Sequence, residues 1–177
     1  MIIGVYWTAR PESAEQAANR LSRFLGSLST GGQELKLGQW FLKGSSRASA
    51  RKRLPTDASS IAKALRTNRR DVDRSVMLEL GFRLSIWNGE NVSFDATIGS
   101  FSAHVTNAAV LSFADDALLL SADQGQTLLQ AAVSAFEPEH GVVASHKQLL
   151  GSNEASPWAV GWFTYDRQGG VRQHANR

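Results

Sequence analysis

The clearest pattern of hydrophobic and polar positions lies in the middle of the chain. Apolar residues occupy every second position over residues 76–87, and the alternation resumes over residues 92–98 after the turn dipeptide Asn88-Gly89. A period of two is typical of a strand with one face in the core, and Asn-Gly favours a tight hairpin. With further strands expected at residues 101–105 and 109–113, this region predicts an antiparallel meander.

Two other segments carry the period of an amphipathic helix. Each begins with a serine followed three residues later by a glutamine, Ser13 with Gln16 and Ser121 with Gln124, which is a spacing typical of a helix start. Their apolar stripes comprise Ala14, Ala17, Ala18, Leu21, Leu25 and Leu28 in the first helix, and Leu128, Leu129, Ala132, Val133 and Phe136 in the second. Arg20 lies off the first stripe and is expected to face water.

Both ends of the chain are rich in aromatic residues and predict strands, at residues 1–8 and 158–165, with weaker strand signals at 37–42 and 141–144. The simplest interpretation places the two terminal strands side by side, closing one core with their aromatic rings. The polar tail over residues 169–177 is expected to fray. The fold that we expect is α+β: a mainly antiparallel sheet with a central meander and two principal helices packed on it.

The length and composition of the chain fit a single domain. Its 177 residues are expected to form one unit, 1–177, and a chain of this length needs no disulfide or metal to hold a core. The absence of cysteine excludes disulfide scaffolds and cysteine-based zinc sites. No stretch reaches the roughly 18 apolar residues of a membrane span, and the N-terminus lacks the pattern of a secretory signal. We therefore expect a cytoplasmic protein without membrane contact.

Charge is concentrated in residues 43–74. This segment holds ten bases against three acids, an excess of seven positive charges, whereas the rest of the chain carries nine bases and thirteen acids. The bases are Lys43, Arg47, Arg51, Lys52, Arg53, Lys63, Arg66, Arg69, Arg70 and Arg74. We expect a loop over residues 43–58 and a short helix over residues 57–68, capped by Asp57. Whether residues 43–74 form a separate lobe stays open.

A basic segment of this kind has three interpretations. Its cations could grip the phosphates of a nucleic acid, although no aromatic residue is interleaved among them to stack on bases. They could instead contact an acidic protein partner, or form a solvated face without a partner. Of the two partners, the acidic protein is favoured over the nucleic acid.

The sequence shows no group of residues with the spacing of a catalytic or metal site. It has neither the Gly-x-Ser-x-Gly turn of a serine hydrolase nor a glycine-rich phosphate loop. The best metal candidates are Glu137, Glu139, His140 and His146. No expected helix carries two of these candidates at a spacing of four residues, and no second cluster completes a coordination shell. Both points argue against a metal. The pair Asp115-Asp116 is more typical of a turn than of catalytic acids, and His104 is expected on the polar face of the strand at 101–105. We therefore expect no enzymatic activity, no cofactor and no metal.

Three short aromatic motifs are spread over the chain: Gly4-x-Tyr6-Trp7-x-x-Arg10, Trp40-Phe41 and Gly161-Trp162-x-x-Tyr165. Together they resemble the immunity protein 52 family, and the resemblance spans almost the whole chain. These are bacterial antitoxins of polymorphic toxin systems, including type VI secretion systems, and they are typically encoded beside toxins with a restriction-endonuclease-like nuclease domain. The resemblance implies a non-enzymatic protein that binds and neutralises its cognate DNase in the cytoplasm. It carries no catalytic residue over to this chain.

Two charged sets compete as the surface that binds such a toxin. The basic set could pair with carboxylates of the nuclease or with an acidic surface on it, and it comprises Arg47, Arg51, Lys52, Arg53, Arg66, Arg69 and Arg70. The acidic set could cover a DNA-binding surface by mimicking phosphates, and it comprises Asp115, Asp116, Asp123, Glu137, Glu139 and Glu154. Charged patches accelerate the encounter of two proteins, so either set is compatible with this function. Both placements stay open at the level of sequence.

Overall fold

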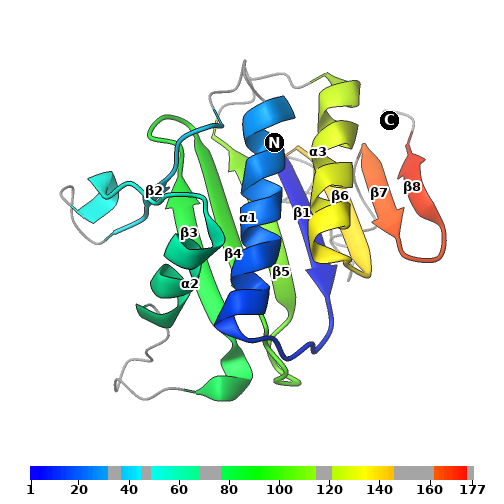
Figure 1. Cartoon of the computed structure of the whole chain (residues 1–177). Helices are drawn as coiled ribbons and strands as arrows, with labels where there is room; N and C mark the ends of the chain where they lie inside the picture. Colours follow the sequence, from blue (N-terminus) through cyan, green and yellow to red (C-terminus); the bar gives the residue numbers. More distant parts are fainter. Residues whose placement is uncertain (32–36, 45–48, 68–76, 115–120, 146–161, 175–177) are drawn as a thin grey trace.

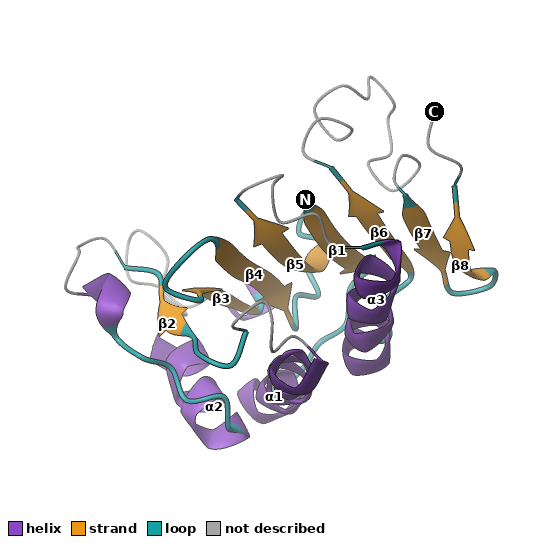
Figure 2. Ribbon diagram, turned by 90° about the horizontal axis from the view of Figure 1, so that it is seen from above, coloured by secondary structure: helices purple, strands orange, loops and turns teal. Residues whose placement is uncertain are grey.

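In the part of the chain that the structure describes, one antiparallel sheet of eight strands forms the body, and three helices lie on one of its faces (Figures 1 and 2). The computed structural model describes residues 1–31, 37–44, 49–67, 77–114, 121–145 and 162–174. The strands are β1 Ile2–Trp7, β2 Phe41–Leu42, β3 Phe82–Trp87, β4 Val92–Ile98, β5 Asn107–Phe113, β6 His140–Ala144, β7 Phe163–Asp166 and β8 Gly170–Gln173. The helices are α1 Ala14–Gly31, α2 Ala58–Thr67 and α3 Ala122–Phe136, with short 3-10 turns at Ser49–Arg51 and Leu78–Leu80.

The order of the strands is β2-β3-β4-β5-β1-β6-β7-β8. Strands β3, β4 and β5 form the predicted meander, and β1 lies between β5 and β6, antiparallel to both. The α+β prediction, with a mainly antiparallel sheet and two principal helices packed on it, is thus confirmed. The short helix α2 adds a third helix beside α1, next to the β3 side of the sheet (Figure 1).

The core lies between the sheet and the helices because alternate strand residues point toward them. In β1 these residues are Ile3, Val5 and Trp7, each at most 3% exposed. Ile3 lies opposite Leu111 of β5 and Val143 of β6, so apolar rows run across the strands on the helix side. The sequence pattern of period two therefore becomes the buried face of the sheet.

Both principal helices begin where their capping residues predict. The backbone N–H of Gln16 donates to Ser13 Oγ at 3.2 Å, and the Gln16 side chain accepts from the N–H of Ser13 at 2.8 Å. Ser121 and Gln124 make the same reciprocal pair before α3, at 3.2 and 2.9 Å. All six predicted stripe residues of α1 are buried, while Val133 of α3 is only partly so.

The expected strand over residues 76–87 is wrong over residues 77–81, while residue 76 lies outside the described residues. Strand β3 starts at Phe82, residues 78–80 form a 3-10 turn, and Leu78 is 59% exposed. Gly81 adopts a φ of +69°, a left-handed conformation that ends the turn and redirects the chain before the strand begins. A Cβ at Gly81 would lie 2.4 Å from the backbone N of Ser100, so this bend depends on glycine.

The expected strand over residues 101–105 is also wrong, because this segment is a loop closed by buried hydrogen bonds. The side chain of Asn107 accepts from the N–H of Ser100 at 2.8 Å and donates to its carbonyl at 2.9 Å. Phe101 is consequently 48% exposed, and His104 lies on an exposed turn rather than in a strand.

Three further predictions, two at the ends of the chain and one at residues 37–42, differ from the structure. Strands β1 and β7 are not neighbours, because β6 pairs with both of them. The tail does not fray from residue 169: Gly170, with a φ of +70°, turns the chain so that β8 pairs with β7. The strand expected over residues 37–42 comprises only β2, Phe41–Leu42. Trp158, at the start of the last predicted strand, lies outside the described residues.

Candidate functional site

The basic loop is fastened to the edge of the sheet by backbone hydrogen bonds. The N–H of Leu42 donates to the carbonyl of Lys52, and the N–H of Leu54 donates to that of Trp40, both at 2.9 Å. Residues 52–54 therefore run antiparallel to β2 as a short extra ribbon. The buried side chains of Leu54 and Trp40 pin this ribbon to the core, so the exposed side chains between them project from a fixed backbone.

Trp87 at the end of β3 fixes the 3-10 turn Ser49–Arg51 by a hydrogen bond. Its indole Nε1 donates to the carbonyl of Ala50 at 2.9 Å, within the 3-10 turn that ends at Arg51. Nearby, Lys43 Nζ lies 2.7 Å from Asp95 Oδ2, so this cation of the basic segment is already paired. The described part of the segment is thus ordered on the β3 side of the sheet. We call residues 49–54 together with α2 the ledge.

Helix α2 adds the second half of the ledge. Its residues Ile61, Ala62 and Leu65 are buried against the body of the protein, which turns Lys63 outward. The cap predicted at Asp57 is present: hydrogen bonds from the side chain of Ser59 and the backbone of Ser60 lower the pKa of the Asp57 carboxyl to about 2. The carboxylate of Asp57 is therefore already hydrogen-bonded at the start of α2.

Four cations of the ledge are exposed and form no ion pair with any other described residue: Arg51, Lys52, Arg53 and Lys63. We call these four residues the basic surface. Arg66, in contrast, pairs with Glu15 at the start of α1. Of the predicted basic set, Arg47, Arg69 and Arg70 lie outside the described residues. Lys63 was missing from that set, although its place opposite the buried Ile61 and Leu65 follows from helical spacing.

The basic surface borders a groove between α2 and residues 52–55, with a volume of about 210 Å³. Lys52 and Arg53 line it from the ribbon, and Lys63 lines it from the helix. Leu42, Leu54, Pro55 and Ala64 contribute apolar lining, and Ser60 and Thr67 contribute hydroxyls. Among the described lining residues there is no acid.

The described members of the acidic set are not brought together. Asp123 lies in the first turn of α3, whereas Glu137 caps the other end of that helix, roughly 20 Å away at 1.5 Å per residue. Glu139 follows Glu137 and accepts a hydrogen bond from the hydroxyl of Thr8 at 2.6 Å. Asp115, Asp116 and Glu154 lie outside the described residues.

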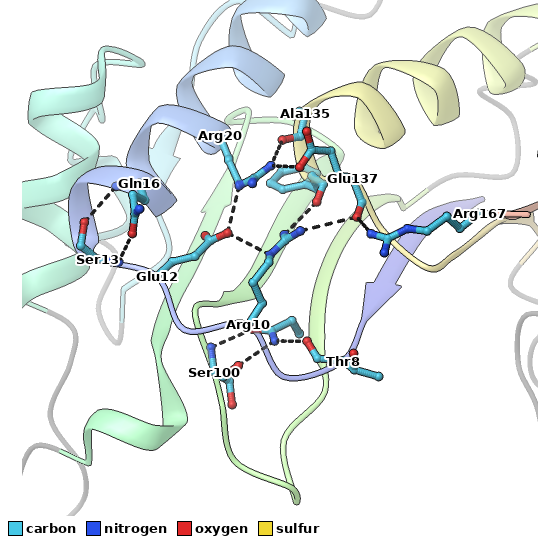
Figure 3. Close-up of polar contacts among 12 residues, drawn as sticks. Thr8, Arg10, Glu12, Ser13, Gln16, Arg20, Ser100, Ala135, Glu137 and Arg167 are labelled. Carbon is cyan, nitrogen blue, oxygen red and sulfur yellow. Dashed lines mark hydrogen bonds and ion pairs between the residues drawn. The ribbon is translucent and has the colours of Figure 1, made fainter.

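Glu137 belongs to a network of charged side chains that joins the start of α1 to the end of α3 (Figure 3). Arg20 reaches Glu137 Oε2 at 3.1 Å and Glu12 Oε1 at 2.9 Å. Arg10 lies 2.9 Å from the same Glu12 oxygen and donates to the carbonyl of Phe136 at 2.8 Å. The expectation that Arg20 faces water is therefore wrong: its side chain is 23% exposed and paired with both carboxylates. The sequence pattern contains no signal for this network, because Phe136 and Glu137 at the end of α3 are distant along the chain from Arg10, Glu12 and Arg20.

Two aromatic motifs also prove to be structural in their described parts. The ring of Trp7 stacks on the ring of Phe136 with centroids 5.6 Å apart, and the Arg10 guanidinium lies 4.9 Å from the centroid of Trp7. Burial lowers the pKa of Arg10, and the nearby Glu12 carboxylate opposes this shift. Trp40 is fully buried and donates its indole N–H to the carbonyl of Leu37 at 3.1 Å. Neither tryptophan is available to a partner.

The metal candidates predicted from the sequence are not brought together in the described part of the chain. No three histidine or acidic side chains there lie close enough to hold a metal ion, and His146 lies outside it. His140 Nδ1 lies 3.3 Å from Asp166 Oδ2, on neighbouring strands. Within the described residues, we find no helix with both the length and the apolar composition that a membrane crossing requires.

None of the curated proteins matches the chain. A protein-family model, described as Immunity protein 52, matches residues 1–172 of the 177. This match covers nearly the whole chain and includes all three aromatic motifs. The chain belongs to the immunity protein 52 family.

Proposed function

We propose that this immunity protein is the antitoxin of a secreted DNase toxin with a restriction-endonuclease-like domain, delivered by a type VI system. It neutralises the toxin in the cytoplasm by non-covalent binding and without catalysis. Family membership supports a toxin partner, and the pairing of such proteins with nucleases supports this class of toxin. The basic surface is the contact that we assign to it.

One observation carries this assignment: the four cations of the basic surface are exposed on an ordered ledge and have no described ion-pair partner. Because the backbone that carries these cations is already fixed, binding has only their side chains left to order. The acidic set supports the alternative placement less well. Glu137 is engaged by Arg20, Glu139 is engaged by Thr8, and Asp123 lies at the far end of α3.

A nuclease offers two kinds of acidic target to such a surface. The carboxylates that hold its catalytic metal lie in the active site, and binding there would exclude DNA directly. An acidic patch elsewhere would be covered without contact to the metal site. Complementary charge accelerates encounter in both cases, and the association rate falls with increasing ionic strength.

The test uses the catalytically inactive nuclease domain encoded beside this gene, titrated calorimetrically with the purified chain. The wild type is expected to bind it and to inhibit the active enzyme. Simultaneous replacement of Arg51, Lys52 and Arg53 by glutamate is expected to weaken binding by at least ~100-fold, since close charge pairs at interfaces are worth several kcal/mol. Arg172→Glu is the matched control, because Arg172 is exposed on β8 at the opposite edge of the sheet.

Three results would overturn parts of this proposal. If the wild type neither binds nor inhibits the nuclease, the antitoxin function is wrong for this toxin. If Asp123→Lys abolishes binding while the triple variant keeps it, the acidic placement replaces the basic one. If the chain binds duplex DNA with a steep salt dependence and no protein partner, it is a nucleic-acid-binding domain instead.

A further inference from the structure

We propose that the groove between α2 and residues 52–55 is a receptor for a carboxylate side chain, an aspartate or glutamate, supplied by the toxin. This inference rests on the proposed function, and it names the chemical group that the basic surface recognises. The argument uses the shape of the groove, its charge, its apolar lining and its rigidity.

The walls of the groove come from two different elements. On α2 the lining residues are Ser60, Lys63, Ala64 and Thr67, which share one helix face because they lie three, four and seven residues apart. The opposite wall is residues 52–55, which run beside β2. The volume of about 210 Å³ suits one side chain. It lies below the roughly 300 Å³ at which pockets for small-molecule ligands begin.

The charge of the groove favours an anion. Lys63 faces Lys52 and Arg53 across it, and none of the three is neutralised by a described acid. Cations that surround a low-dielectric hollow reinforce one another's potential. The nearest acid along α2, Asp57, accepts hydrogen bonds from Ser59 and Ser60 at 2.6 and 2.9 Å at the helix start.

The apolar lining distinguishes a carboxylate side chain from the phosphate of a duplex. Leu42, Leu54 and Pro55 form a surface against which the methylene groups of a glutamate or aspartate can pack. A carboxylate also accepts hydrogen bonds in the forked geometry that the Arg53 guanidinium provides. A duplex presents its phosphates on a convex backbone, which long surface side chains reach without needing a hollow.

The groove is ordered before binding. Hydrogen bonds at 2.9 Å fix residues 52–54 to β2, and the buried Ile61 and Leu65 fix α2. The side chain of Ser22 on α1 further holds the carbonyl of Thr56 at 2.7 Å, between the two walls. A carboxylate would therefore enter a site whose backbone has no rearrangement to make.

The experiment compares variants inside and outside the groove on the same basic surface. Lys63→Glu reverses the charge on the α2 wall of the groove, and Lys63→Met removes that charge. Arg51→Glu reverses a charge that lies outside the groove lining. Affinity for the inactive nuclease domain is expected to fall by at least ~100-fold for Lys63→Glu and about tenfold for Lys63→Met. Arg51→Glu is expected to slow association by less than about tenfold. Equal losses for Lys63→Glu and Arg51→Glu would overturn the proposal, as would no loss for either.

A second measurement does not depend on the toxin. An acetylated tripeptide of glutamate is titrated into the ¹⁵N-labelled full chain, and amide shifts are followed by NMR. Saturable shifts confined to residues 52–54 and 60–67, and absent in Lys63→Glu, are expected. If these shifts occur but the nuclease does not bind, the proposed function fails while the carboxylate site stands. No saturable shift with the peptide, or saturable shifts with a 15-base-pair duplex alone, would overturn the carboxylate site. The melting temperature of Lys63→Glu should equal that of the wild type, because Lys63 is exposed.

Discussion

Replacing Arg10 with alanine should destabilise the fold without changing the toxin-binding surface. Arg10 belongs to the first aromatic motif, and its side chain is 25% exposed. It donates to the carbonyl of Phe136 at 2.8 Å, lies 2.9 Å from Glu12 Oε1 and covers the ring of Trp7 at 4.9 Å. The substitution therefore removes a positive charge from the C-terminal end of α3, where the helix dipole favours cations.

The magnitude follows from these contacts. A hydrogen bond from a charged donor contributes about 1.5–3 kcal/mol, and a partly exposed cation–π contact contributes about 0.5–1 kcal/mol. Glu12 keeps Arg20 at 2.9 Å, so its carboxylate is not left alone. We expect a loss of about 2–4 kcal/mol in the free energy of unfolding. At about 2–4 °C per kcal/mol for a chain of this size, the melting temperature should fall by roughly 5–15 °C.

The assay is thermal and urea unfolding of wild type, Arg10→Ala and Arg167→Ala, each paired with calorimetric binding to the nuclease domain. Arg167 is the matched control: it donates to the carbonyl of Glu137 at 2.6 Å but is exposed. Its loss should cost less than about 1 kcal/mol. If Arg10→Ala unfolds like the wild type but no longer binds the nuclease, the motif is part of the interface and our structural interpretation is refuted.

Three further predictions concern stability. Asn107→Ala should cost about 2–4 kcal/mol in urea unfolding, because it leaves the buried N–H of Ser100 without its partner and removes the donor to the carbonyls of Ser100 and Thr8; a loss below about 0.5 kcal/mol would contradict the loop geometry. Ser121→Ala should cost about 1 kcal/mol by removing the cap of α3, and an unchanged urea midpoint would show that the cap contributes nothing. The folded-state pKa of Asp57 is lowered from 3.8 to about 2, chiefly by the hydroxyl of Ser59, so its carboxylate stabilises the fold above pH 3.8 and this contribution is lost as the pH falls through 2. Urea unfolding at a series of pH values should therefore show wild type and Asp57→Ala converging toward pH 2, and a constant difference would refute this assignment.

The sequence predicted those parts of the fold that depend on local patterns. The alternation over residues 92–98 became β4 unchanged, and both capping pairs mark real helix starts, because periodicity and caps act within a few residues. The error at Leu78 had a non-local cause. Its exposure follows from the bend at Gly81, which packs against the backbone of Ser100. The alternation of apolar and polar residues alone does not predict that contact.

The candidate site was predictable to a similar extent. The clustering of bases along the chain pointed to the ledge, since Arg51, Lys52 and Arg53 are adjacent in sequence. Lys63 was missed because it joins them only when α2 packs beside residues 52–55. The described members of the acidic set show the converse: Asp123 and Glu137 flank the same helix in sequence, and the length of α3 separates them.

Survival of cells that carry the neighbouring toxin decides whether this chain is an antitoxin that acts through its basic surface. The toxin gene is induced in a bacterial host with the wild-type chain, with the variant in which Arg51, Lys52 and Arg53 are glutamate, or with Arg172→Glu, at equal protein levels. We expect survival and intact chromosomal DNA with the wild type and with Arg172→Glu, and DNA degradation and death with the triple variant. Equal killing with and without the wild-type chain would contradict the antitoxin function, and full protection by the triple variant would contradict the basic surface as its site.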